Sequence, residues 1–183
     1  MSKQTDFPSR WLLAAAIAFA GLPVQAQMLD GASKAEDSRL ARSDVRWMEQ
    51  AARVNVAEVE AGKLAAGLGQ RIEVREFGKT MVEQHGKANE ELNAIATRKR
   101  VVLLNRPDAA HHQELVKLAA LSGTAFDEIY LRTAGIGDHT DAAKLFEDGI
   151  ANLHDPDLKA YAGRTLPQIK QHFEMLREIS PLH

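Results

Sequence analysis

The chain has 183 residues, and its 23 Lys and Arg side chains nearly balance 25 Asp and Glu, for a formal net charge of −2 at pH 7. So small and mixed a charge argues against nucleic acid or an anionic membrane surface as the main partner. The sequence contains no cysteine. Disulfides, thiol nucleophiles and cysteine metal ligands are therefore excluded, and a hydrophobic core must supply the stability.

The first twenty-six residues follow the pattern of a secretory signal peptide. Positive charges at Lys3 and Arg10 precede an apolar run at residues 11–21, and small residues at Val24 and Ala26 mark a cleavage site. The alternative is an uncleaved membrane anchor, but a run of this length covers only about half of a hydrocarbon core of roughly 30 Å. We therefore predict cleavage after Ala26 and an exported, periplasmic protein with no membrane-spanning segment in the mature chain.

Beyond the cleavage site, the composition predicts a polar, disordered leader at residues 27–42 and a single all-α domain at residues 43–180. Within the domain, apolar residues recur at spacings of three and four, which is typical of amphipathic helices. The pattern predicts long helices that span residues 43–68, 71–99, 124–149 and 155–180. The turn between the first two is so short that these helices must run antiparallel.

A long crossover, residues 100–123, separates the two helical hairpins. Asp108 can cap a short extra helix at residues 109–120, and the whole segment is long enough to travel the length of a bundle. Two helices, a long crossover and two more helices make the plan of a ferritin-like four-helix bundle. A simple up-and-down bundle, with the crossover packed as a fifth helix, is the alternative.

Five motifs occur in one order along the mature chain. They are Ala57 to Ala65 (AEVEAGKLA), Phe77 to His85 (FGKTMVEQH), Leu121 to Asp127 (LSGTAFD) with Tyr130, the pair Asp138-His139, and Thr165-Leu166-Pro167 with His172. Together they resemble the family called domain of unknown function 4142, exported bacterial proteins with a ferritin-like fold that are often labelled predicted outer membrane proteins. The resemblance covers residues 44–179 and implies the fold and export, but no activity. Gln84 precedes His85 where the family usually has aspartate, which removes one carboxylate near that histidine.

Each of the four long predicted helices carries one polar residue in line with the apolar residues of its buried face. These residues are Glu58, His85, His139 and His172. Counted from the predicted helix starts, all four lie near mid-helix, so they share one level of the bundle whichever way each helix runs. Three neutral imidazoles and a carboxylate suit zinc, copper or iron. The sequence therefore raises the hypothesis that these four side chains bind one transition-metal ion as a cofactor.

The alternative for the same residues is a metal-free polar network in the core. A buried histidine commonly bonds a hydroxyl, an amide or a carboxylate, and the candidate partners are Glu58, Tyr130, Thr133, Thr165 and Gln168. Dinuclear iron oxidation is less favoured than either alternative, because it needs a glutamate three residues before a histidine. Those positions hold Val82, Ile136 and Ile169.

The sequence leaves two classes of function open. The first, which the sequence favours, is a non-enzymatic binding or interaction protein of the cell envelope, whose partner is another protein or a second copy of the chain. The second is a mononuclear metal-binding protein. The sequence shows no catalytic motif and no phosphate-binding loop, and a role in envelope stress fits both classes.

Overall fold

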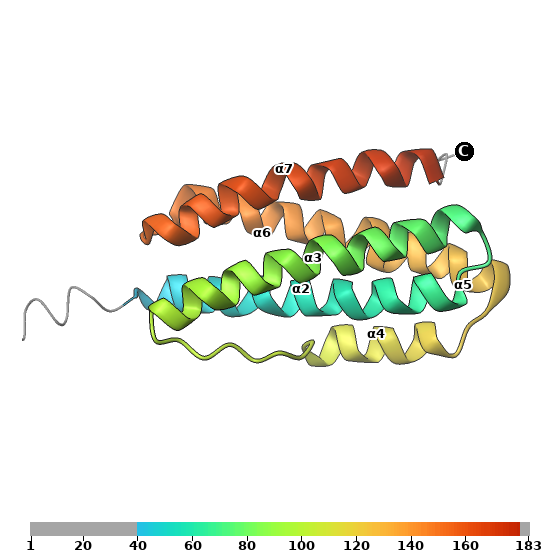
Figure 1. Cartoon of the computed structure of the whole chain (residues 1–183), viewed down its shortest axis with the longest axis horizontal. Coiled ribbons are helices and arrows are strands. Elements are labelled where there is room, and N and C mark those ends of the chain that lie inside the picture. Colours follow the sequence, from blue (N-terminus) through green and yellow to red (C-terminus); the bar gives the residue numbers. More distant parts are fainter. Residues whose placement is uncertain (1–39, 180–183) are drawn as a thin grey trace, which may run out of the picture. The chain divides into compact units, whose positions relative to one another are not determined.

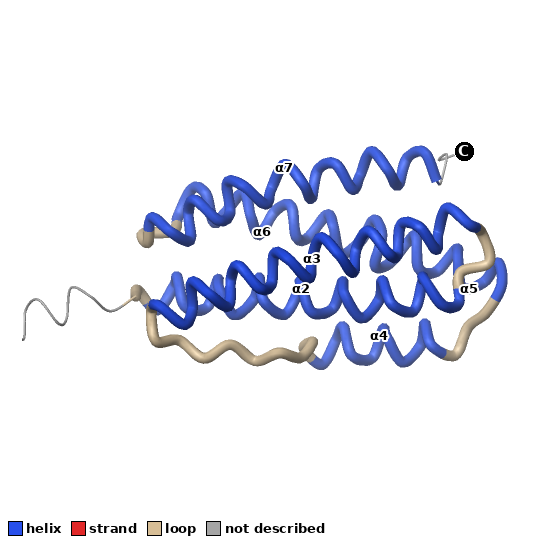
Figure 2. Tube along the Cα trace, viewed as in Figure 1, coloured by secondary structure: helices blue, strands red, loops and turns tan. Residues whose placement is uncertain are grey.

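A computed structural model of the chain describes residues 40–179, which belong to one structural unit. The predicted signal peptide and most of the predicted leader lie outside the described residues. Every regular element within residues 40–179 is a helix (Figure 1 and Figure 2), as the sequence predicts. None of these described helices is both long enough and apolar enough to cross a membrane.

The first hairpin consists of α2 (Arg42–Leu68) and α3 (Ile72–Arg98), which run antiparallel along each other (Figure 1). Each bound lies within one residue of its prediction, and the end of the predicted leader belongs to α2. The two backbones approach closely at Gly62 and Gly78, where a Cβ on Gly78 would lie 2.6 Å from the carbonyl oxygen of Gly62. Only glycine permits so close an approach, so these two residues set the separation of the helices.

The crossover returns along the bundle, as predicted. After α3 the chain runs back as an extended segment and then as α4 (Ala109–Ala119), toward the end where α5 (Gly123–Tyr130) begins (Figure 1). Asp108 caps α4, because its side chain accepts a hydrogen bond of 2.9 Å from the backbone N–H of His111. The short helix packs against α2 and α5 and fully buries only Leu118. It therefore covers the bundle from outside and is not part of the four-helix core.

The third long helix differs from its prediction. The sequence predicts one regular α-helix, whereas the structure has α5, then the π-helical segment η1 (Leu131–Gly137), then α6 (Asp138–Asn152). Gly135 and Gly137 weaken the α-helical conformation locally, and the Ala134 carbonyl oxygen accepts a bond from the His139 side chain. Segments of this kind occur frequently at functional sites.

The last helix, α7 (Pro156–Ile179), folds back against α6 and completes the second hairpin. Asp155 caps its start, since the carboxylate accepts bonds from the N–H groups of Asp157 and Leu158. Across the hairpins, α2 packs on α6 and α3 packs on α7. These contacts confirm the predicted ferritin-like four-helix bundle with a long crossover that carries a short extra helix.

Candidate metal centre

A layer of buried polar side chains lies between two apolar clusters of the core. One cluster includes Trp47 and Phe146, and the other includes Phe77 and Phe126. At the middle of the four long helices, between these clusters, five polar side chains are at most 3% exposed: Asn55, Glu58, His85, His139 and His172. All four predicted site residues therefore belong to one buried layer.

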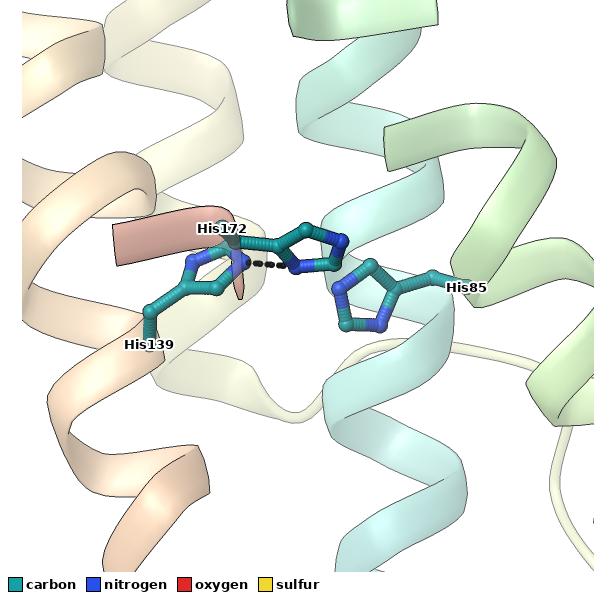
Figure 3. Close-up of side chains that lie close together, drawn as sticks. All are labelled: His85, His139 and His172. Atoms are coloured by element: carbon teal, nitrogen blue, oxygen red, sulfur yellow. Dashed lines mark hydrogen bonds between the residues drawn. The ribbon is translucent and has the colours of Figure 1, made fainter. Parts of the chain in front are cut away.

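The three histidines converge on one another (Figure 3). One ring nitrogen from each lies within 4.8 Å of one from each of the others, and the ring centroids are 5.0 to 5.5 Å apart. Because a metal–imidazole bond is about 2.0–2.1 Å long, one ion among the rings contacts all three after small ring movements. Among residues 40–179, no other group of three or more His, Asp or Glu side chains converges in this way.

Each ring uses its outer nitrogen to bond an acceptor. Nδ1 of His85 donates to Oδ1 of Asn55 over 3.1 Å, and Nδ1 of His139 donates to the Ala134 carbonyl oxygen over 3.0 Å. Nε2 of His172 donates to Oε1 of Gln84 over 2.7 Å. Histidines that bind metal ions show this arrangement, in which an outer acceptor fixes the ring orientation and the proton position.

Each ring carries its proton on the outer nitrogen, so the inner nitrogen of each ring presents a lone pair to the other two rings. A neutral imidazole carries one N–H, and each ring uses it on the outer side. Nε2 of His85 accordingly has no hydrogen-bond partner, and Nε2 of His139 lies 2.9 Å from Nδ1 of His172, where a hydrogen bond forms only if one of the two rings carries its proton on the inner side. If the Gln84 amide turned so that its nitrogen donated to Nε2 of His172, the proton of His172 could move to Nδ1 and bond Nε2 of His139. Nε2 of His85 would still lack a partner. A cation among the three nitrogens satisfies all of them at once.

Glu58 lies behind His139 and not among the inward nitrogens. Its Oε1 is 3.3 Å from Nδ1 of His139, and neither carboxylate oxygen has a hydrogen-bond partner. Burial raises the pKa of Glu58 well above its usual value, and the charges of Asp138 and Glu114 raise it further. The structure thus brings the three predicted histidines together and places the predicted carboxylate at the outer nitrogen of one of them.

Residues 30–179 match the family described as Domain of unknown function (DUF4142). The chain belongs to this family. The resemblance carried by the five motifs is therefore confirmed. This DUF4142 fold is similar to the crystal structure of a DUF305 fragment from Deinococcus radiodurans, with a TM-score of 0.68 over 77% of this chain and 97% of that chain. At 11% sequence identity the likeness shows the fold alone, and no curated protein matches the chain.

Burial keeps the histidines of this DUF4142 domain neutral. It lowers the pKa of His85 well below the usual value, and the neighbouring histidines lower it further. Burial also lowers the pKa of His139, against a smaller opposing effect of the backbone carbonyls that it bonds. Burial lowers the pKa of His172 to about 3, and the repulsion that a protonated His139 would exert contributes to the shift. The neutral ring is the form that binds a metal ion, so all three side chains are in the correct state near pH 7.

We expect acid to destabilise the metal-free DUF4142 domain through His172. Its pKa is about 3 in the folded chain but about 6.5 in an unfolded one, so the unfolded state takes up the proton first. Stability is therefore lost between about pH 6.5 and pH 3, by up to roughly 1.4 kcal/mol per pH unit. The melting temperature of chelator-treated protein should fall across this window, and less steeply in His172→Gln. Parallel curves for the two proteins would contradict this expectation.

Two of the acceptors that bond the outer histidine nitrogens in the DUF4142 domain, Asn55 and Gln84, were not among the hydrogen-bond partners predicted from the sequence. Asn55 lies one turn before Glu58 on the same helix, and its Nδ2 also donates to the hydroxyl of Tyr161. Gln84 directly precedes His85. Two predicted partners bond their own helices instead, since the hydroxyls of Thr133 and Thr165 donate to backbone carbonyls one turn earlier, and the buried hydroxyl of Tyr130 has no hydrogen-bond partner.

Proposed function

We propose that this DUF4142 protein is exported to the periplasm and binds one transition-metal ion inside its bundle, through His85, His139 and His172. The observation that carries the proposal is the direction of the ring nitrogens. Each outer N–H already has an acceptor, so three lone pairs converge where a cation would sit. Export is supported by the charged start, apolar run and small-residue exit of the first twenty-six residues.

This geometry supports metal binding over the role as an interaction protein, which the sequence alone favours. A metal-free polar network is favoured where the buried nitrogens have hydrogen-bond partners, and no group of the described residues bonds Nε2 of His85. A metal-binding role accounts for that nitrogen directly. The role as an interaction protein with a protein partner or a second copy stays a prediction, because no described contact tests it.

Burial supports metal binding without catalysis. The three imidazoles are at most 3% exposed, so a substrate has no open approach to an ion held among them. Three neutral nitrogen ligands suit zinc, copper, iron or nickel ions. A zinc ion held by three histidines commonly takes water or substrate as a fourth ligand, and a fourth ligand here would have to be a small molecule such as water.

Metal content is the first test of the proposal. Protein purified from a periplasmic fraction without a histidine tag should contain about one transition-metal ion per chain by elemental analysis, and chelator should lower its melting temperature. The mature chain should begin at Gln27, as determined by N-terminal sequencing. Metal-free protein whose melting temperature does not respond to added zinc, copper or iron would refute metal binding, and protein confined to the cytoplasm would refute export.

A further inference from the structure

Glu58 is a buried carboxylate without a cationic partner. It is 1% exposed, and neither of its oxygens accepts a hydrogen bond. Within residues 40–179 no Lys or Arg pairs with it, and the charged side chains that act on it, Asp138 and Glu114, are also acidic. An ionised carboxylate in such a place is costly unless a positive charge lies close by. Without such a charge the carboxyl group stays protonated, so Glu58 can ionise only when a cation is bound nearby.

The histidine centre, in contrast, has no anionic ligand. Its three ligands are neutral, and aromatic side chains pack around them, with the centroid of Phe77 6.2 Å from that of His139 and 6.3 Å from that of His172. The centroid of Phe173 is also 6.2 Å from that of His139. A divalent ion here would place two positive charges in the core with no anionic ligand, and such a charge needs a counter-charge nearby.

His139 lies between Glu58 and the other two histidines. Its Nε2 faces the other histidines, whereas its Nδ1 lies 3.3 Å from the carboxylate of Glu58. The N–H at Nδ1 donates to the Ala134 carbonyl oxygen, so Glu58 acts on the ring through its charge at this short distance and not through a hydrogen bond. Across the ring, the carboxylate would lie about 7 Å from an ion at a bond length of about 2 Å. With an effective dielectric constant of about 20, one unit of ion charge at that distance corresponds to roughly a 50-fold change in affinity.

We propose that Glu58 makes the centre selective for divalent over monovalent ions, by supplying the counter-charge through His139. This inference rests on the proposed function, because it requires an ion at the three histidines. Glu58 acts from behind one ligand and does not bind the ion itself. The larger the charge of the ion, the more its affinity depends on Glu58.

Zn²⁺ and Ag⁺ test the proposal, because both have filled d shells and they differ in charge. The affinity of the full-length exported protein for each ion is measured at one pH by competition with a chelator, in wild type and in Glu58→Gln, whose amide has nearly the same size. We expect the ratio of Zn²⁺ to Ag⁺ affinity to fall by roughly 10- to 50-fold in the variant. An equal loss for both ions, or no loss, would overturn the proposal.

Asp44→Asn is the matched control. Asp44 is also a fully buried carboxylate of α2, but it accepts bonds from the backbone N–H groups of His154 and Asp155 at one end of the bundle. It lies fourteen residues from Glu58, which is about 21 Å along the helix. The control should lower stability and leave the affinity ratio unchanged. A similar change of ratio in the control would contradict a specific role for Glu58.

Glu58→Asp separates charge from folding, with circular dichroism as the check on structure. It keeps the carboxylate, so the affinity ratio should stay within about threefold of wild type even where both affinities fall. If Glu58→Gln does not fold, this variant decides, and a collapse of its ratio would overturn the proposal. Wild-type protein that binds neither ion would refute the proposed function instead, so the two failures are distinguishable.

Discussion

Chelator should cease to lower the melting temperature once His139 is replaced by alanine. In wild type, an ion present at a hundred times its dissociation constant stabilises the fold by about 2.7 kcal/mol, which is roughly 5–10 °C for a chain of this size. His139 contributes one of the three inward nitrogens and connects the centre to Glu58. His139→Ala should therefore lose the bound metal, and its melting temperature should be the same with and without chelator.

The competing explanation for His139 makes a different prediction for the same variant. If the histidine were only a member of a polar network, its loss would cost about 1–3 kcal/mol and leave the chelator effect as it was in wild type. His112→Ala is the control, because this histidine is exposed on α4, outside the buried layer. The control should keep both the metal and the chelator effect. Equal chelator sensitivity in wild type and His139→Ala would refute the ligand role.

The bundle could be predicted because its elements depend on local signals. Apolar spacing reveals the buried face of each long helix, and Asp108 and Asp155 mark helix starts by caps that the structure shows as hydrogen bonds. The same periodicity places the three histidines at mid-helix on buried faces. Their common level follows from residue counting alone, since every helix rises by about 1.5 Å per residue.

The remaining features depend on contacts between distant parts of the chain. Periodicity indicates a face and a level, but not which ring nitrogen points inward, so it could not place Glu58 at the outer nitrogen of His139. The acceptors Asn55 and Gln84 lie on helices other than those of His85 and His172, the histidines that donate to them. The π-segment before His139 involves a side-chain bond to the Ala134 carbonyl oxygen, which helix propensity does not reveal.

Gly78→Ala should destabilise the bundle and weaken metal binding together. A Cβ at this position would lie 2.6 Å from the carbonyl oxygen of Gly62 and 2.8 Å from the backbone nitrogen of Ala66. Backbone atoms cannot rotate away, so α2 and α3 must separate. Overpacking of this kind costs about 1–3 kcal/mol or more, which exceeds the gain of about 1 kcal/mol from replacing a helical glycine. We expect the melting temperature to fall by roughly 3–10 °C.

The effect of Gly78→Ala should reach the metal centre because the same helix pair positions it. His85 lies two turns after Gly78, and its outer nitrogen bonds Asn55 across the α2–α3 interface over 3.1 Å. Separation of the helices lengthens that bond and loosens the ring, so Zn²⁺ affinity should fall as well. Gly86→Ala is the control on the same helix, since a Cβ there meets nothing within 4 Å, and it should stabilise the bundle by up to about 1 kcal/mol. Equal stability of the two alanine variants would show that the close approach at Gly78 does not limit the fold, and that the position of His85 does not depend on it.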